Sequence, residues 1–178
     1  LLWVREHEPE LWARVRSVLL PKDYIRYRLT GALGTDVGDA SGTLLFDVDR
    51  RSWSGRMLRT MNIDPACMPR VLESADCAGR LIDSVAAQLG LPPAIPVAAG
   101  SGDNMCAGIG AGVVEPGCVL AVLGTSGVIY ANSDAPRRDL PTPADPNRPA
   151  GRVHTMCDGA GPRAWCVTGC TLSAGGAL

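Results

Sequence analysis

The segment AIPVAAGSGDN, residues 94–104, decides how this chain can fold. Its first half is short and apolar, which predicts a strand, and its second half is a turn of small residues before a helical stretch. The apolar spacing of residues 78–90 predicts a helix that precedes the strand and ends at Gly90. The order of helix, strand, Gly-rich turn and helix predicts an α/β fold with parallel strand pairing. Ligands of such folds bind near the carboxyl ends of the strands, and Asp103 stands at such an end.

Asp103 has two interpretations at this position. Aspartate is a favoured N-cap residue, so its carboxylate could simply satisfy free N–H groups at the start of the following helix. Alternatively, it could act as a general base that takes a proton from a substrate hydroxyl. Asn104, directly after it, adds an amide that can bind polar groups of a substrate. The residues by themselves leave both interpretations open.

A second loop, GTSG (residues 124–127), lies between two β-rich runs and predicts a hairpin turn. Gly124 lets the backbone approach an anion closely, and Thr125 and Ser126 add hydroxyl groups, a combination that suits phosphate. An ordinary turn without a ligand is the alternative. A base in one loop and a phosphate-binding turn in another are the two parts that phosphoryl transfer to a hydroxyl needs, so together they favour that reaction.

The composition is that of an ordinary globular protein. The 178 residues are 46% hydrophobic and 20% charged, enough for one core or for one domain and part of another. Seventeen basic residues against eighteen acidic ones leave a net charge of -1, which argues against a nucleic-acid partner. No apolar run approaches the roughly 20 residues of a membrane-spanning helix, and no signal peptide is visible, so we expect a cytoplasmic protein.

The seven cysteines are scattered and include no Cys-x-x-Cys pair. The two histidines, His7 and His154, are not at metal-ligand spacing. We therefore predict neither disulfides nor a metal site, and interpret the cysteines as buried free thiols. Three familiar motifs are also missing from the sequence: a Walker loop, a dinucleotide-binding Gly-x-Gly-x-x-Gly and a Gly-x-Ser-x-Gly nucleophile elbow.

Helical patterns dominate the first third of the chain. Two helices are predicted at 9–19 and 21–30, because proline suits a first helical turn and Gly31 suits a helix end. In the second helix, Tyr24, Ile25 and Leu29 are predicted to face inward. Shorter patterns predict an extended segment and a further helix, at 43–48 and 53–61.

The character of the sequence changes between Val113 and Gly117, and β-rich runs predominate beyond. This change predicts two domains, 1–113 and 114–178. The elements predicted in the second domain are the GTSG hairpin, an exposed loop with five prolines, a second strand pair and the start of a helix, at 118–133, 134–152, 153–159 with 163–169, and 170–178.

Five segments of the chain occur in the order seen in the FGGY family of carbohydrate kinases. They are LPKDYIRYRLTG (20–31), TDVGDASGTLLFDV (35–48), GSGDNMCAGIGAG (100–112), LGTSGVIYA (123–131) and TLSAGG (171–176). Five ordered segments are far more specific than any one of them, and they extend over nearly the whole chain. The chain resembles this family, and most closely its xylulokinase branch.

The resemblance implies an actin-like ATPase (ribonuclease H-like) fold of two lobes, with this chain holding the end of the sugar-binding lobe and the start of the nucleotide lobe. It implies that Asp103 is the catalytic base that deprotonates a sugar hydroxyl and that Asn104 lies close to the sugar. It also implies that Gly124, Thr125 and Ser126 reach the phosphates of ATP, which is used with Mg²⁺. The implied reaction is ATP-dependent phosphorylation of a pentulose, most closely D-xylulose to D-xylulose 5-phosphate.

Other features of the family are not found in this sequence. Its Asp-x-Gly-Thr phosphate hairpin and its Gly-rich adenosine segment are missing, so we expect an internal piece of a longer protein that is inactive alone. Asp158 stands where a xylulokinase-like protein is expected to have a second histidine, which leaves its role open. Three alternatives also stay open: a family member for another polyol or sugar acid, a non-catalytic sugar- or nucleotide-binding module, and a hydrolase using Ser126 or Asp103. The oligomeric state is open as well, a homodimer included.

Overall fold

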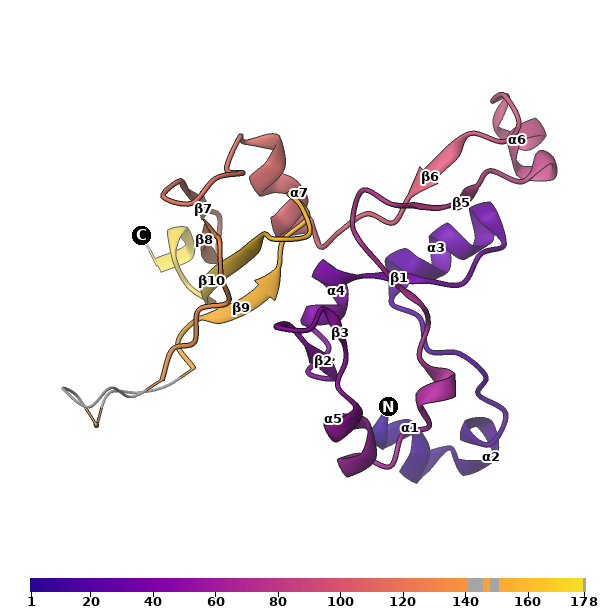
Figure 1. The fold of residues 1–178 in the computed structure, drawn as a ribbon, viewed down its shortest axis with the longest axis horizontal. Helices are drawn as coiled ribbons and strands as arrows, with labels where there is room; N and C mark the ends of the chain where they lie inside the picture. Colours follow the sequence, from indigo (N-terminus) through magenta and orange to yellow (C-terminus); the bar gives the residue numbers. More distant parts are fainter. Residues whose placement is uncertain (141–145, 148–150, 178) are drawn as a thin grey trace.

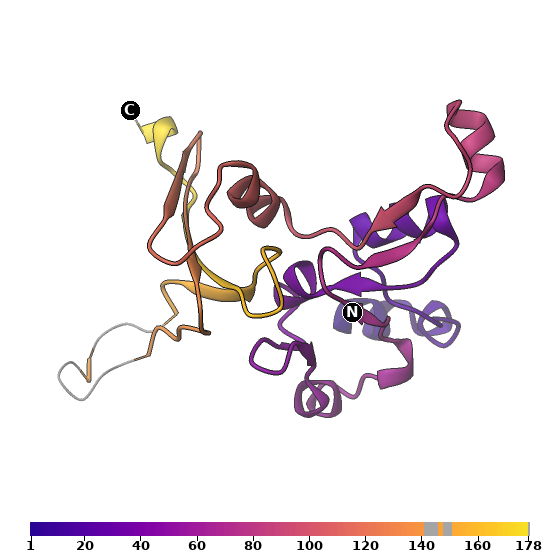
Figure 2. The ribbon, with the colours of Figure 1, turned by 45° about the horizontal axis from the view of Figure 1, so that its top comes forward.

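The computed structural model of this chain describes residues 1–140, 146–147 and 151–177. Figure 1 shows two parts: short helices and two-stranded sheets come first, and a four-stranded sheet follows helix α7 (Asp103–Gly110). Figure 2 shows that the segment between β6 (Pro96–Ala98) and α7 joins the two parts. The predicted mixture of helices and strands is confirmed.

The strand before Asp103 is present, but its predicted parallel pairing is wrong. Strand β6 pairs antiparallel with β5 (Cys77–Arg80), which takes up the beginning of the helix predicted at 78–90. Glycine permits this strand, because a Cβ at Gly79 would lie only 2.8 Å from the Cβ of Thr30. The apolar spacing from which the helix was predicted contains no information about this contact with a distant segment.

The helix predicted there begins later, as α6 (Asp83–Leu89). It ends at Gly90 as predicted, with a left-handed φ of 66° that glycine adopts without strain. One strand pair among the described residues of the first part is parallel, β1 (Thr35–Asp36) with β4 (Val71–Leu72).

The helix predicted at 9–19 is wrong beyond Trp12. It ends there as α2 (Pro9–Trp12), and further on Val18 donates its backbone N–H to the carbonyl of Cys67 (2.9 Å). The helix predicted at 53–61 is confirmed in its central part. The other elements of the first part are α1 (Leu2–His7), α4 (Val37–Ser41), α5 (Gly55–Thr60), η1 (Pro65–Cys67), β2 (Phe46–Asp47) and β3 (Ser52–Trp53).

Helix α3 (Pro21–Thr30) has the predicted bounds and ends at Gly31, but it buries a different face from the one expected. Tyr24 and Ile25 were predicted to face inward and are 48% and 59% exposed. The buried residues are Asp23 and Arg26. Charged side chains occupy the interior here because they pair with one another and with backbone groups.

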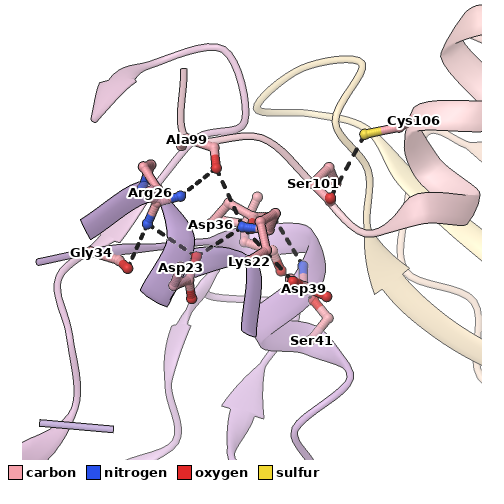
Figure 3. Close-up of polar contacts among 11 residues, drawn as sticks. Lys22, Asp23, Arg26, Gly34, Asp36, Asp39, Ser41, Ala99, Ser101 and Cys106 are labelled. Carbon is pink, nitrogen blue, oxygen red and sulfur yellow. Dashed lines mark hydrogen bonds and ion pairs between the residues drawn. The ribbon is translucent and has the colours of Figure 1, made fainter. Parts of the chain in front are cut away.

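A network of ion pairs and hydrogen bonds joins α3, β1 and the loop that precedes α7 (Figure 3). Lys22 Nζ donates to Asp23 Oδ1 (2.8 Å) and to Asp36 Oδ2 (2.6 Å). Arg26 Nη2 lies 3.0 Å from Asp23 Oδ1. Both cations also donate to the carbonyl of Ala99, Lys22 at 3.3 Å. The Asp23 and Asp36 side chains are fully buried, so these charges depend on their partners, and the network ties the loop to α3.

The second part is an antiparallel sheet in the order β7-β8-β10-β9. The GTSG hairpin and the second strand pair are confirmed. The predicted C-terminal helix is reduced to η2 (Gly175–Ala177), because Cys170 and Thr171 still belong to β10. The predicted loop 134–152 lies partly outside the described residues. The strands are β7 (Val119–Leu123), β8 (Gly127–Ser133), β9 (His154–Cys157) and β10 (Trp165–Thr171).

The interpretation of the cysteines as buried thiols holds for only two of them. Cys157 and Cys166 are buried, and Cys67 is half-buried. The other four are exposed: Cys77, Cys106, Cys118 and Cys170. Three of these lie on β5, α7 and β10, and Cys118 lies just before β7, so a small apolar side chain does not by itself ensure burial.

Helix α7 packs closely on strand β8. A Cβ at Gly108 would lie 2.4 Å from Cε1 of Tyr130, so only glycine allows this approach. Met105, Val113 and Cys166 complete the buried cluster around the Tyr130 ring. The helix that begins with Asp103 is therefore held by the second sheet, while the loop before it is held by the first part.

Gly108→Ala is expected to destabilise the chain by about 1–3 kcal/mol, the usual effect of overpacking. The matched control is Gly110→Ala in the same helix, where nothing lies within 4 Å of the new methyl group. The control is expected to be neutral or to stabilise by up to about 1 kcal/mol, because alanine favours the helix. Urea unfolding of the parent and both variants measures the difference. Equal stability of the two variants would contradict the close packing on Tyr130.

Arg26→Leu is expected to lower the free energy of unfolding by about 3–5 kcal/mol, because it removes one partner of a buried ion pair. Arg28→Leu is the control on the same helix: this side chain is exposed, and its hydrogen bond goes to Tyr24 Oη at 3.1 Å. Denaturant titration of both variants tests the comparison. A loss of the same size at both positions would show that Arg26 is not specially required.

Candidate functional site

A cavity of about 160 Å³ lies where α4, the start of α7 and the second sheet meet. Two of the side chains predicted to bind substrate, Asp103 and Asn104, line it. The other lining residues are Gly38, Asp39, Gly42, Gly102, Met105, Tyr130, Met156, Cys166 and Thr168.

Side chains of α3 hold the loop before Asp103 in place. Gly100 has a left-handed φ of 83°, and a Cβ there would lie 3.5 Å from Cδ of Lys22, so the chain turns tightly over the lysine stem. The Ala99 carbonyl accepts hydrogen bonds from Lys22 and Arg26. Burial alone would lower the pKa of Lys22, but its hydrogen bonds to Asp23 and Asp36 raise it above the ordinary value. The ammonium group therefore stays charged and keeps the loop in place.

Asp103 is the first residue of α7, and the N-cap position belongs to Gly102. Its carboxylate accepts a hydrogen bond from the N–H of Asn104 (2.8 Å), and the residue is exposed. This local contact orients the carboxylate and leaves other lone pairs open to the cavity. The geometry is suited to a group that meets a ligand.

Asp39 also lines the cavity, and the sequence interpretation missed it. The residue lies in the first turn of α4, and its N–H bonds to Asp36 Oδ1 (2.9 Å), which caps the helix. Two aspartates three positions apart across a helix start were the available signal. Their different roles depend on which of them points into the cavity, and the sequence does not show that.

The predicted phosphate loop is the exposed turn between β7 and β8. Within the described residues, the N–H and hydroxyl groups of Thr125 and Ser126 have no hydrogen-bond partner. Groups of this kind can bind an anion. Gly124, Thr125 and Ser126 do not line the cavity that holds Asp103 and Asn104.

The turn is supported by the C-terminal TLSAGG segment, a contact that the sequence did not indicate. Gly175 donates its N–H to the carbonyl of Gly124 (2.9 Å), and Ala174 donates to that of Thr125 (2.8 Å). A Cβ at Gly175 would lie 2.7 Å from the Gly124 carbonyl oxygen, so glycine is needed there. These contacts occupy the carbonyl groups of Gly124 and Thr125. The Gly124 N–H donates to the carbonyl of Ser126 (2.9 Å), so the N–H groups that could meet an anion are those of Thr125 and Ser126.

Asp158 is buried and belongs to the support of the site. It accepts hydrogen bonds from Tyr130 Oη, from Asn132 Nδ2 (3.0 Å) and from the N–H of Ala160 (3.0 Å). Burial, and then the hydrogen bond to Asp158, raise the pKa of Tyr130 far above its ordinary value, so the hydroxyl keeps its proton and donates it. Asp158 thereby holds the ring that packs on α7.

The described residues offer neither a metal-binding cluster nor a membrane-spanning helix. Within residues 1–140, 146–147 and 151–177, no three His, Cys, Asp or Glu side chains gather closely enough to hold a metal ion. Over the same ranges, none of the helices has both the length and the apolar character needed to cross a bilayer.

Comparison with known proteins identifies the family. Residues 1–110 match the FGGY family of carbohydrate kinases, N-terminal domain. Over 178 residues the chain is 40% identical to a xylulose kinase of Bacillus subtilis (strain 168) and 38% identical to one of Escherichia coli (strain K12). Each alignment covers all of this chain and 34% of the relative. The chain therefore spans about a third of the length of these curated relatives.

A solved structure agrees with the sequence matches. A protein described as a xyloylose kinase from Brucella ovis superposes with a TM-score of 0.86 at 39% identity, over 99% of this chain and 34% of that one. The implied actin-like ATPase fold is thereby confirmed. The order of the five quoted segments, the family match and the superposition agree: this chain belongs to the FGGY family of carbohydrate kinases.

Proposed function

We propose that this chain is part of an ATP-dependent kinase that phosphorylates D-xylulose to D-xylulose 5-phosphate. The observation that carries the proposal is the carboxylate of Asp103, which opens beside Asn104 into a small cavity at the start of α7. The names of the relatives support the choice of sugar, since the two quoted above are xylulose kinases. Because the chain spans about a third of them, the activity is proposed for the whole protein.

In the proposed reaction the oxygen of a sugar hydroxyl attacks the γ-phosphorus of ATP. The bond from that phosphorus to the bridging oxygen breaks, ADP leaves, and Asp103 takes the hydroxyl proton. Asn104 holds the sugar beside the base. The phosphates of ATP bind at Gly124, Thr125 and Ser126, where the N–H and hydroxyl groups of Thr125 and Ser126 offset negative charge.

Strand β8 supports this division of roles. It starts directly after Ser126, and three residues beyond its first one it carries Tyr130, which packs on α7 and lines the cavity. One strand therefore connects the proposed phosphate site with the wall of the proposed sugar site. Carbohydrate kinases generally use Mg²⁺ with ATP, so we expect the proposed kinase to use it as well.

Asp103→Asn in the complete kinase is expected to lower kcat by about 10²–10⁴-fold, the usual contribution of a general base. Asparagine can keep the local contact with the Asn104 N–H, so the melting temperature is expected to change little. Coupled ADP release with D-xylulose, and a melting curve on the same preparation, provide the two readings. Normal turnover per folded molecule together with a lower melting temperature would assign Asp103 to helix capping alone.

Replacing both Thr125 and Ser126 with Ala is expected to lower kcat/KM for ATP at least about tenfold and to leave the sugar KM unchanged. Hydrogen bonds to charged groups contribute about 1.5–3 kcal/mol each, which supports this size of effect. A double variant at two exposed helical positions, Thr60→Ala with Ser84→Ala, is the control. Unaltered ATP kinetics in the first variant would leave the hairpin as an ordinary turn.

A further inference from the structure

The carboxylate of Asp39 lies close to the start of the helix that carries Asp103. Asp39 comes from α4 and Asp103 from α7, and both line the same 160 Å³ cavity. Oδ1 of Asp39 is 3.6 Å from the point that a Cβ on Gly102 would occupy, next to the proposed base. Figure 3 shows Asp39 beside Lys22 in the ion-pair network.

The Asp39 carboxylate lies farther from the Lys22 ammonium group than the carboxylates of Asp23 and Asp36 do. Lys22 Nζ lies 3.8 Å from Asp39 Oδ2, against 2.8 Å to Asp23 and 2.6 Å to Asp36. The side chains of Asp23 and Asp36 are fully buried, while that of Asp39 is 32% exposed. In the described part of the chain, no hydrogen bond reaches the Asp39 carboxylate, so its lone pairs are open to a ligand.

The environment of Asp39 disfavours its ionised form. Burial raises its pKa above the ordinary value; Lys22 lowers it, and the charges of Asp36, Asp23 and Asp103 raise it further. Its ionised form is therefore disfavoured in the folded chain, and the capping of α4 is already done by Asp36. Strained or repelled charges of this kind are typical of functional sites.

We propose that Asp39 is a sugar-binding residue that accepts hydrogen bonds from hydroxyl groups of the acceptor and selects a neutral polyol or ketose over a sugar acid. This inference rests on the proposed kinase function and names the substrate class of the same cavity. Two carboxylates face the ligand, and the nearest cation, Lys22, is already shared by Asp23 and Asp36. A hydroxyl donor satisfies these acceptors, whereas a ligand carboxylate is repelled by both.

The main test compares Asp39→Asn with the wild type in the complete kinase. The variant is expected to raise the KM for D-xylulose about tenfold or more, because a hydrogen bond to a charged acceptor is lost. The kcat and the KM for ATP are expected to stay within about threefold. Inhibition by D-xylonate, a sugar acid of similar size, is expected to strengthen. Asp83→Asn, an exposed position in α6, is the matched control and is expected to change none of these values.

Stability separates a binding role from a structural one. At neutral pH an aspartate with a raised pKa is ionised against the preference of the fold, and an asparagine removes that penalty. The melting temperature of Asp39→Asn is therefore expected to equal or exceed that of the wild type. A lower melting temperature with a parallel loss of ATP and sugar kinetics would overturn the proposal and assign Asp39 to the fold.

The pH dependence of the sugar KM provides an independent test. As the pH falls through the raised pKa of Asp39, the carboxylate takes a proton, and the KM for D-xylulose is expected to rise while the KM for ATP stays flat. Asp39→Asn is expected to flatten this dependence. A sugar KM that is independent of pH in the wild type, or unchanged in the variant, would overturn the role of Asp39. A wild type without sugar-dependent ADP release would instead refute the proposed kinase function itself.

Discussion

The contact on which the rest of this structure depends is the pair of hydrogen bonds that Lys22 and Arg26 donate to the Ala99 carbonyl. Both cations form ion pairs with buried aspartates. If either cation moved away, it would leave a buried carboxylate without that partner. Through them helix α3 determines where the chain leaves the first part. Everything after that carbonyl, including the Gly-rich turn and Asp103, starts from a position that this network sets.

A second contact, between α7 and Tyr130 of β8, fixes the helix that follows this turn. Gly108 allows the ring of Tyr130 to lie directly on α7, and Asp158 holds that ring through its hydroxyl. The helix is thus attached at its start to one part of the chain and along its length to the other. A short segment attached at both ends can hold a catalytic side chain in place, and the cavity forms at the junction.

Local chemistry explains which elements the sequence predicted correctly. Left-handed glycines at 31 and 90 end their helices, and the GTSG turn joins two strands, because these choices depend on only a few neighbouring residues. Strand β5 and the end of α2 were missed for the opposite reason. Their conformations depend on Thr30 and on Cys67, partners far away along the chain. Periodicity also favoured Tyr24 and Ile25 as the inner face of α3, since apolar patterns do not reveal paired charges in an interior.

By itself the sequence determined the mixed α/β character, the family through five ordered segments, and the place of Asp103 and Asn104 between a strand and a helix. Only the tertiary structure decided that Asp39 lines a cavity with them, that Gly175 bonds to the GTSG turn, and that Asp158 supports a tyrosine. The physical reason is the range of the interactions. Turns and helix ends are set by backbone conformation within a few residues, whereas a cavity is formed by side chains that meet only after distant segments have packed.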